Sequence, residues 1–588
     1  MWQETKGAGF QWMAGSIQNF SETGISVEPP AQAVSAEELA KSDLWIFREG
    51  RREFSGGEFV RELQQRIAAR EPVLDSLIQA GELEAAIADI GGPSAETAAQ
   101  LTDALARRYC SSVSGHGAEP GMTHGRDPEE VARRIVPPER LSISPPEGFT
   151  YYALHPMDFV RLAEQIAAEK DDFAVIGIRS IGTTLSAVIA ATLEFKGKKT
   201  ARITARPSGH PYSRVTEFSP EQKRWVAEQN LRTAQFVLAD EGPGRSGSTF
   251  LSVAEALLRE EVPRARITIL GSRAFDPGSL CAQQAAERWR QFRFLSATSS
   301  MSERFRNWMY IGGGDWRSYY SGPEEDWPES WTQMERFKVL SPDRREFVKF
   351  EGMGRIGNEV KHRAYVLANA GFSPEVCDAG DGFLAYAALS GRPLTRQDTS
   401  PELLERIARY CAFRLSAFRD SRSMNGELEQ MLTFNIHQEF GRELQFEPGA
   451  LASGEQVIVD GRMQPYEWIA TPDGKVLKTD AVSHGDNHFF PGPCGIAWDL
   501  AGVVVEWDLG REAKEFLLEA FRKFSGGHPP QDLTKHILAY CVFRMGFCKM
   551  ARSTVRGSNE ENRLNRAYHR YRARAAELLD MANASAAA

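Results

Sequence analysis

The sequence predicts a multidomain α/β protein with a helical N-terminal segment, and three observations support this. The chain has 588 residues, more than one ordinary domain. Short apolar strands alternate with helices from about residue 149, which is typical of a parallel sheet. A hairpin, a helix and a further strand follow from about residue 335, which is typical of an α+β domain. The predicted parts are an irregular arm (1–40), a helical region with a linker (41–148), a parallel-sheet domain with an elaborated connection (149–330) and a second domain (331–588).

Composition limits the classes of partner. The chain has 70 Lys and Arg against 79 Asp and Glu, a net charge of −9, which gives no electrostatic footprint for nucleic acid. No apolar stretch approaches the roughly 18 residues of a membrane-spanning helix. The seven cysteines form no CxxC pair, which is typical of reduced thiols in the cytoplasm. We therefore expect small-molecule partners, neither membrane nor nucleic acid, and leave homo-oligomerisation open.

The elements are predicted in order along the chain. Residues 41–110 have helical periodicity, interrupted by Gly91, Gly92 and Pro93, and a Gly-, Pro- and Ser-rich linker follows. The strands of the parallel sheet are expected at 173–178, 199–205, 234–240 and 265–272. Residues 280–330 are aromatic and Gly/Pro-rich and are interpreted as a long connection. Residues 335–352 are expected to form a β-hairpin.

A Gly-rich loop follows the strand that ends at Asp240 and Glu241. Such a loop, with a helix beginning near Phe250 behind it, offers backbone N–H groups to an anion. The two carboxylates can accept hydrogen bonds from vicinal hydroxyls, so the pattern suits a sugar phosphate. The alternative is an ordinary strand-to-helix turn without a ligand.

The same strand–loop–helix pattern occurs upstream and offers a second anion loop. Its candidate residues are Gly177, Arg179, Ser180, Gly182 and Thr183. Two anion loops with an acidic pair between them match a sugar that carries phosphate at both ends. We expect the loops to lie side by side at the carboxyl edge of one sheet, with the acids bordering a solvated pocket.

These two loops give residues 150–275 a resemblance to type I phosphoribosyltransferases. The resemblance implies PRPP as ligand, with Asp240 and Glu241 on the ribose hydroxyls and the upstream loop on pyrophosphate. It implies a 5-phosphate site at Arg245, Ser246, Gly247, Ser248 and Thr249, and catalytic-loop candidates at Arg206, His210, Tyr212 and Arg214. A plain loop role is the alternative for His210 and Tyr212. The chain departs from the family by having four residues, instead of three, between the acids and Ser246.

The second domain offers a Lys in a strand and a Glu in the following helix. Lys349 lies within an apolar strand, and Glu359 follows ten residues later. A buried lysine needs an anionic partner or a phosphate, and a strand Lys paired with a helix Glu positions ATP phosphates in protein-kinase-like folds. We expect Lys349 and Glu359 to form that ion pair; the alternative is a solvated surface pair.

Two further carboxylates each follow an apolar strand. Asp460 and Asp480 end strands that we expect to form a hairpin around Pro472, Asp473 and Gly474. Phosphoryl transfer requires one carboxylate to orient the attacking hydroxyl and another to bind Mg²⁺.

Residues 335–575 thereby resemble aminoglycoside-phosphotransferase-like kinases, a family with a two-lobed α+β domain. The resemblance implies ATP as substrate and Mg²⁺ as cofactor, Asp460 as catalytic acid–base and Asp480 as metal ligand. Pro465 stands where the family has Asn, so Gln464 or Glu467 would be the second ligand. A rival register assigns catalysis to Asp486 and the metal to Asp499; a separate metal site at His484, Asp486 and His488 is a further alternative.

The combined expectation is a bifunctional enzyme of nucleotide or nucleoside metabolism. The middle domain would carry out Mg²⁺-dependent phosphoribosyl transfer or phosphorolysis, and the C-terminal domain would phosphorylate a small molecule with ATP. The alternative is a nucleotide-sensing regulator whose domains bind such ligands without turnover, which the missing Asn and the longer loop favour.

Overall fold

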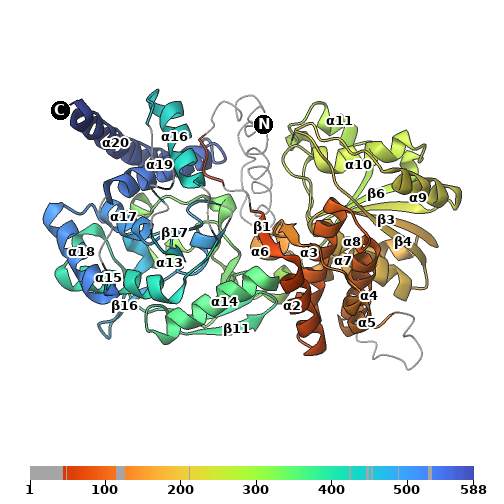
Figure 1. The fold of residues 1–588 in the computed structure, drawn as a ribbon, viewed down its shortest axis with the longest axis horizontal. Helices are drawn as coiled ribbons and strands as arrows, with labels where there is room; N and C mark the ends of the chain where they lie inside the picture. The colour runs from red at the N-terminus through yellow and green to blue at the C-terminus, as the bar shows by residue number, and fades with distance from the viewer. Residues whose placement is uncertain are drawn as a thin grey trace. The chain divides into compact units, whose positions relative to one another are not determined.

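The computed structural model describes residues 44–47, 50–113, 126–210, 212–422, 426–444, 449, 451, 454–487, 489–527 and 533–587. The arm predicted over residues 1–40 lies outside these. The described chain divides into two compact units (Figure 1), which we call the first and second unit. The first unit contains Gly50–Asn307 and Gly352–Asn358, and the second contains residues 44–47, Trp308–Glu351 and the chain from Glu359 onward.

The first unit is built on a five-stranded parallel sheet. Its strands in spatial order are β4 (Lys199–Ala205), β3 (Asp172–Ile178), β5 (Gln235–Ala239), β6 (Ile267–Gly271) and β7 (Arg293–Ser296). In chain order this is 2-1-3-4-5, a doubly wound arrangement whose switch point lies between β3 and β5. The four strands predicted from the sequence are confirmed. β7 lies in the segment for which only a connection was predicted.

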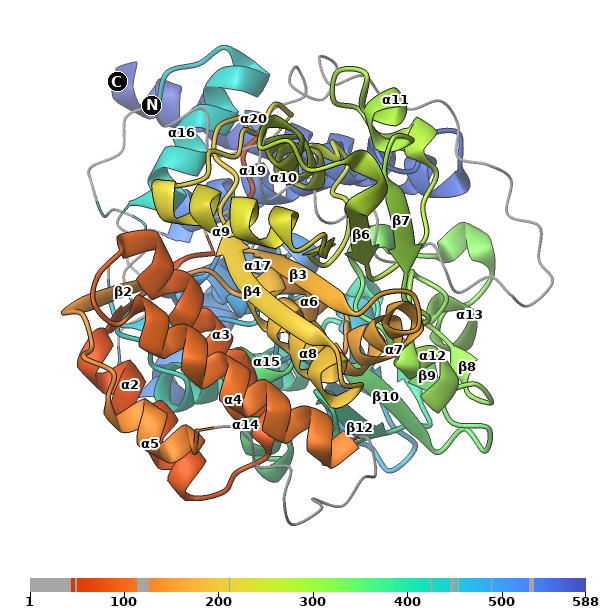
Figure 2. The same ribbon diagram turned by 90° about the vertical axis from the view of Figure 1, so that its right-hand side faces the viewer.

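Helices cover both faces of this sheet, which is why its three central strands, β3, β5 and β6, are mostly apolar and buried. Figures 1 and 2 show α9 (Pro220–Leu231) and α10 (Ser248–Arg259) on one face and α7 (Pro156–Ala167) and α8 (Ile181–Phe195) on the other. Every residue of β5 and of β6 is buried. Two short helices, α11 (Ala285–Trp289) and α12 (Ser300–Arg304), flank β7 in the chain.

The N-terminal helices share a hydrophobic core with α8. They are α2 (Gly56–Ala68), α3 (Val73–Ile90), α4 (Ala95–Val113) and α5 (Pro128–Arg133), and their buried leucines, isoleucines and alanines pack with Ala187, Val188 and Ala191. The predicted break between two helices at 91–93 is confirmed. Two antiparallel strands, β1 (Arg52–Ser55) and β2 (Arg140–Ile143), pair across the ends of this helical region, and the short helix α6 (Glu147–Tyr151) follows β2.

The second unit begins with an antiparallel sheet in the order β11-β12-β10-β9-β8. The bounds are β8 (Met309–Tyr310), β9 (Lys338–Leu340), β10 (Glu346–Phe350), β11 (Val376–Gly380) and β12 (Phe383–Ala387), with α14 (Gly354–Asn369) between β10 and β11 in the chain. The predicted hairpin at 335–352 is confirmed as β9 and β10. Register places Lys338 directly opposite Lys349.

The remainder of the second unit is mostly helical. Its helices are α13 (Arg317–Tyr320), α15 (Pro401–Ala417), α16 (Glu427–Phe440), α17 (Ala497–Glu506), α18 (Arg511–Ser525), α19 (Leu533–Arg552) and α20 (Asn559–Ala587).

Two small sheets correct the predicted hairpin of Asp460 and Asp480. β14 (Gln456–Ile458), which precedes Asp460, pairs with β17 (Pro493–Gly495). The hairpin around residues 471–474 is instead formed by β15 (Trp468–Ala470) and β16 (Val476–Lys478), with β13 (Arg392–Pro393) at its edge. Gly461, at a φ of 78°, lies in the turn by which the chain leaves β14. The two aspartates therefore follow strands of different sheets.

Residues 44–47 are extended and bind to the second unit, which corrects the prediction of a helical region from residue 41. The Trp45 backbone N–H donates to Asn435 Oδ1 (2.5 Å), and Asn435 Nδ2 donates to the Trp45 carbonyl (2.8 Å). Phe47 forms a β-bridge with Phe489, and the two rings lie 5.0 Å apart.

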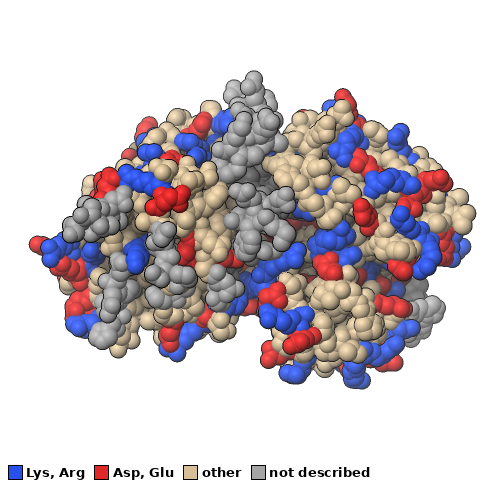
Figure 3. All heavy atoms as spheres, turned by 45° about the horizontal axis from the view of Figure 1, so that its top comes forward, with Lys and Arg blue, Asp and Glu red and all other residues tan. Residues whose placement is uncertain are grey.

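The described helices include none that combines the length and apolar character needed to span a bilayer. On the face drawn in Figure 3, basic and acidic side chains are interspersed.

Candidate functional sites

A cavity of about 160 Å³ lies in the second unit between the antiparallel sheet and the chain around residues 462–489. The sheet contributes Lys338, Phe347, Lys349 and Tyr386 to its wall. Charged and aromatic side chains from elsewhere complete the wall: Trp316, Trp331, Glu335, Glu351, Arg462, Tyr466, Glu467, Lys478, Asp480, His484, Phe489 and Arg544. The cavity therefore combines several cations and acids with aromatic surface.

Lys349 points into this cavity, but its partner is not the predicted one. Its Nζ lies 2.9 Å from Glu351 Oε1 and also forms an ion pair with Asp480. The predicted Lys349–Glu359 ion pair is wrong. Glu351 takes the partner's place because residues two apart in a strand point to the same face.

Asp480 follows β16 and lies where three basic side chains converge. Besides Lys349, Lys338 Nζ lies 3.6 Å from its carboxylate and His484 Nε2 lies 3.4 Å away. Burial by itself would raise the pKa of Asp480, but Lys349, Lys338 and His484 lower it well below its usual value. Asp480 is therefore a half-buried, ionised carboxylate.

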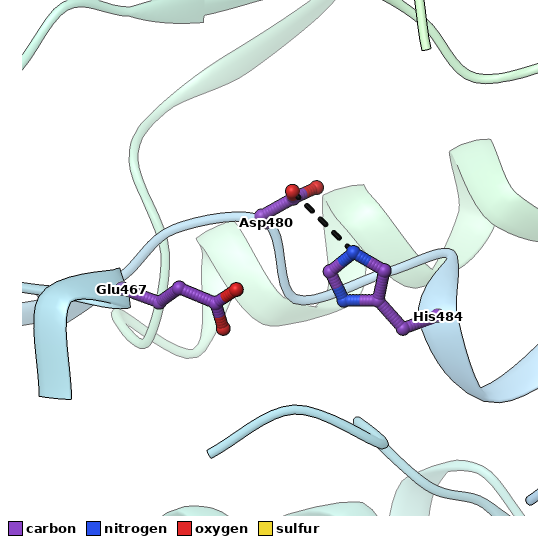
Figure 4. Close-up of side chains that lie close together, drawn as sticks. All are labelled: Glu467, Asp480 and His484. Carbon is purple, nitrogen blue, oxygen red and sulfur yellow. Dashed lines mark ion pairs between the residues drawn. The ribbon is translucent and has the colours of Figure 1, made fainter. Parts of the chain in front are cut away.

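Glu467, Asp480 and His484 bring one ligand atom each to within 4.8 Å of one another, and Figure 4 shows the three side chains converging. Lys478 Nζ lies 2.8 Å from Glu467, yet burial raises the pKa of Glu467 to about 7. Burial and the charge of Arg462 lower the pKa of His484 to about 3, so its imidazole is neutral. Two carboxylates in reach of one point fit Mg²⁺, whose ligands are oxygen atoms.

Asp460 does not line the cavity, which corrects its predicted placement beside ATP. Its side chain is 0% exposed, accepts a hydrogen bond from the Tyr410 hydroxyl and lies 3.4 Å from Lys478 Nζ. Its backbone N–H and that of Gly461 donate to Asp499 (2.9 and 3.0 Å). The Asp499 side chain is equally buried, so Asp499 also does not fit the metal-ligand role of the rival register. The side chain of Asp486 and all of His488 lie outside the described residues.

Sequence reasoning missed several cavity residues, including Lys338, Arg462 and Lys478. Two signals in the sequence could have identified Lys338 and Lys478. The hairpin register places Lys338 beside Lys349, and two opposed cations need acids nearby. Lys478 precedes Asp480 by two residues at the end of β16.

The first unit brings together the two predicted anion loops. Gly177, near the end of β3, pairs in register with Ala239 at the end of β5, so both loops begin at the carboxyl edge at the switch point. The predicted side-by-side position of the loops is confirmed. A Cβ at Gly182 would lie 2.4 Å from the Ala239 carbonyl oxygen, so the close approach requires glycine at this position.

Asp240 and Glu241 lie between the loops but are only 2% and 3% exposed, so the expected solvated pocket beside them is wrong. Burial raises the pKa of Asp240 well above its usual value and that of Glu241 to about 7. Glu147, on α6, is half-buried, and burial of its carboxyl together with the charge of Glu241 raises its pKa to about 8. Glu147 Oε2 and Glu241 Oε2 have no hydrogen-bond partner among the described residues.

The other residues predicted for the anion site lie before and after Asp240 and Glu241 in the sequence. Arg179 and Arg206 both bind Asp89 of α3. His210 and Tyr212 stack with ring centroids 5.5 Å apart, and Arg214 Nη1 lies 3.4 Å from the Pro207 carbonyl. In the loop before α10, Ser246 Oγ accepts from the Ser248 N–H (3.2 Å) and Gly247 has a φ of 68°. Ser180 is the N-cap of α8, and Thr183 lies in the first turn of that helix. Gly247 is the N-cap of α10, and Ser248 and Thr249 lie in its first turn. Thr183 Oγ1 has no hydrogen-bond partner among the described residues.

Comparison with known proteins gives similarity in structure alone. No family model matches the chain, and no curated protein matches its sequence. The structure of choline kinase from Streptococcus pneumoniae is 15% identical over 41% of this chain and 90% of that chain, with a TM-score of 0.29. A choline/ethanolamine kinase family protein from Mesorhizobium loti is 14% identical over 40% and 84%, with a TM-score of 0.27. Spectinomycin phosphotransferase in complex with ADP and spectinomycin is 10% identical over 46% and 92%, with a TM-score of 0.28.

Proposed function

We propose that the second unit binds ATP with Mg²⁺ in its cavity and transfers the terminal phosphate to a small hydroxylated molecule. The observation that carries this proposal is the convergence of Lys349, Asp480 and Glu467 on one cavity. Phosphoryl transfer depends chiefly on positioned charges, and this cavity holds both cations for phosphate oxygens and carboxylates for a metal ion.

Each side chain has a defined part in this proposal. Lys338 and Lys349 lie opposite each other in the β9–β10 hairpin and would bind phosphate oxygens. Asp480 and Glu467 would hold Mg²⁺, which supplies charge neutralisation on the phosphates. Arg462 would stabilise the charge that develops on the transferred group.

Binding requires these side chains to exchange partners. The cavity volume of about 160 Å³ is below the roughly 300–1,000 Å³ of typical ligand sites. Lys349 pairs with Asp480, and Lys478 pairs with Glu467. A phosphate that replaces Asp480 as the partner of Lys349 frees that carboxylate for the metal, so the same step opens the cavity and completes the metal site.

A second candidate, nucleotide sensing without turnover, is favoured by the burial of Asp460. Tyr410 and Lys478 hold that carboxylate away from the cavity. Arg462, two residues after Asp460 in the sequence, lines the cavity instead. A site that keeps phosphate and metal ligands but lacks an acid to orient a hydroxyl would bind ATP and not consume it.

For the first unit we propose binding of a phosphorylated ribose such as PRPP, and phosphoribosyl transfer. Two glycine-containing loops at the switch point of a 2-1-3-4-5 sheet, with Asp240 and Glu241 between them, support this proposal. Arg179 and Arg206 add guanidinium groups suited to pyrophosphate. With both activities the chain would be a bifunctional enzyme.

A transfer assay tests the proposal for the second unit. The full chain is incubated with ATP labelled in the terminal phosphate, Mg²⁺ and pools of amino alcohols, sugars and nucleosides. We expect a labelled small molecule with the wild type and no labelled product with Lys349→Met. Lys475→Met, which changes an exposed lysine of the β15–β16 hairpin, is the control and should give the same product as the wild type. ATP binding without any labelled product in any pool would support sensing and contradict transfer.

A separate assay tests the first unit. PRPP is supplied with Mg²⁺ and a panel of purine and pyrimidine bases, and pyrophosphate release is measured. We expect release with one base class, and loss of release together with loss of PRPP binding in the double variant Asp240→Asn, Glu241→Gln. Equal PRPP affinity in this variant and the wild type would contradict the ribose-binding role of the acids.

A further inference from the structure

Asp89 binds both arginines of the anion site in the first unit. Its Oδ1 accepts hydrogen bonds from Arg179 Nη1 (2.7 Å) and Arg206 Nε (3.0 Å), and its Oδ2 accepts one from Arg206 Nη2 (2.5 Å). The three residues come from separate elements: Asp89 from α3, Arg179 from the loop after β3, and Arg206 from the loop after β4. One carboxylate thus joins the two loops whose arginines we assign to pyrophosphate.

Arg179 and Arg206 are held together around that carboxylate. Arg206 Nη1 donates to the Arg179 backbone carbonyl (3.0 Å), so the Arg206 guanidinium is also held against the loop that carries Arg179. The Arg179 side chain is 10% exposed, while those of Asp89 and Arg206 are 32% and 31% exposed, so the acid is more exposed than Arg179. A ligand arriving from solvent therefore meets Asp89 before it meets Arg179.

The position of Asp89 in its helix indicates that its charge is used at this site. It is the penultimate residue of α3, where the helix dipole disfavours a negative charge. The two arginines compensate for that placement. A carboxylate that bridges two guanidinium groups presents the same paired oxygen atoms as a phosphate group.

Positive charge exceeds negative charge around this carboxylate. Arg214 lies near Arg206 and Asp240, and burial together with the charge of Arg206 lowers the pKa of Arg214. Burial raises the pKa of Asp240, so Asp240 neutralises these arginines less than an exposed aspartate would. The unbalanced cations are available to a further phosphate group.

We propose that Asp89 competes with phosphate ligands at this anion site and sets the affinity that a ligand needs in order to bind, because it occupies the place of one phosphate group. The inference rests on the anion binding proposed for the first unit. A lone phosphate that displaces Asp89 regains only the hydrogen bonds that Asp89 gave up. A diphosphate regains these and adds contacts from its second phosphate to Arg214 or to the loop N–H groups, so the site selects linked phosphates.

Calorimetric titration of the full chain with inorganic pyrophosphate and with orthophosphate, both with Mg²⁺, tests this role. We expect the wild type to prefer pyrophosphate. Removing the competing charge in Asp89→Asn should tighten the binding of both anions about tenfold, because each of them displaces Asp89. Asp89→Ala should change both affinities in the same direction, and thermal unfolding identifies any variant that fails to fold.

Asp171→Asn is the matched control. It removes the same charge from an acid that pairs with Lys198 just before β3, at the end of the sheet opposite the loops. We expect its two affinities to equal those of the wild type. Unchanged affinities for both anions in Asp89→Asn, or weaker binding of both, would overturn the inference, the latter because Asp89 would then only position the arginines. A wild type that binds neither anion nor PRPP would instead refute the anion site itself, and with it any competition by Asp89.

Discussion

Lys349 and Asp480, which are 131 positions apart in the sequence, form an ion pair inside the cavity of the second unit. Lys349 comes from the antiparallel sheet, and Asp480 follows the small hairpin of β15 and β16. The two charges that kinase chemistry would assign to phosphate and metal thus neutralise each other. Their separation on nucleotide binding is the conformational step that the proposed function requires.

Asp480→Asn should remove the Mg²⁺-dependent part of ATP binding, because a metal ligand is lost while Lys349 retains Glu351 as a partner. The measurement is the shift of the unfolding midpoint with ATP, in Mg²⁺ and in EDTA, since at a given concentration a ligand that binds more tightly stabilises the folded state more. Asp473→Asn, at the exposed turn of the same hairpin, is the control and should respond like the wild type. If ATP binding by Asp480→Asn depended on Mg²⁺ as much as ATP binding by the wild type does, the Asp480 carboxylate would be excluded as a metal ligand.

Asp460→Asn should destabilise the second unit rather than merely stop catalysis. The variant leaves Lys478 with one acidic partner fewer in a fully buried site, and such losses cost about 3 kcal/mol. Tyr410→Phe removes one hydrogen bond from the same carboxylate and should cost about 1 kcal/mol. Denaturant unfolding measures both. A normally stable Asp460→Asn protein that binds ATP but transfers no phosphate would restore the catalytic role.

The first unit should lose stability as the pH rises from about 5 to about 8. Burial raises the pKa of Glu147 to about 8 and that of Glu241 to about 7, so the folded state binds protons more tightly than the unfolded chain. The contribution of these two groups to the free energy of unfolding is complete below the ordinary glutamate pKa and is lost as the pH passes the raised values. Calorimetric unfolding at pH 5.5, 7 and 8.5 should show a fall of up to about 5 kcal/mol in the free energy of unfolding.

Glu147→Gln should flatten this pH profile, because the amide stays uncharged throughout. Glu221→Gln, an exposed glutamate at the start of α9, is the control and should keep the wild-type profile. Parallel profiles for Glu147→Gln and the wild type would show that Glu147 is not the titrating group.

Asn435→Ala should release the extended segment at residues 44–47 from the second unit. Asn435 both donates to and accepts from the Trp45 backbone, and both atoms of Trp45 are buried there. Leaving buried backbone groups unpaired should lower the free energy of unfolding by about 2 kcal/mol. Gln438→Ala, on the exposed face of the same helix, should change stability little. Equal stability of the two variants would show that the segment contributes nothing.

The sequence was informative where the signal was local. Apolar runs such as 173–178 and 234–240 gave the strands, and the acids and glycines after them gave the loops, because the carboxyl edge of a parallel sheet collects such residues. β7 escaped notice because it has only four residues, of which Arg293 is exposed. Burial of Asp240 and Glu241 depends on α6 and the surrounding chain, which no local pattern reports.

The cavity of the second unit was only partly predictable. Lys349 and Asp480 were predicted because each is a charged residue within or directly after an apolar strand, and both line the cavity. The choice between Glu351 and Glu359 as the partner of Lys349 depends on how the helix packs, and a nearer acid on the same strand face takes the contact. The position of Asp460 was mispredicted because β14 pairs with β17, a partner that lies beyond Asp480 in the chain.

The most direct test of the central claim is a structure of the full chain with a non-hydrolysable ATP analogue and Mn²⁺ in place of Mg²⁺. We expect phosphate density beside Lys349, with the Lys349–Asp480 pair opened, and an anomalous metal peak bound by Asp480 and Glu467. Nucleotide density elsewhere on the chain, or a cavity that keeps the Lys349–Asp480 ion pair at saturating analogue, would contradict the account.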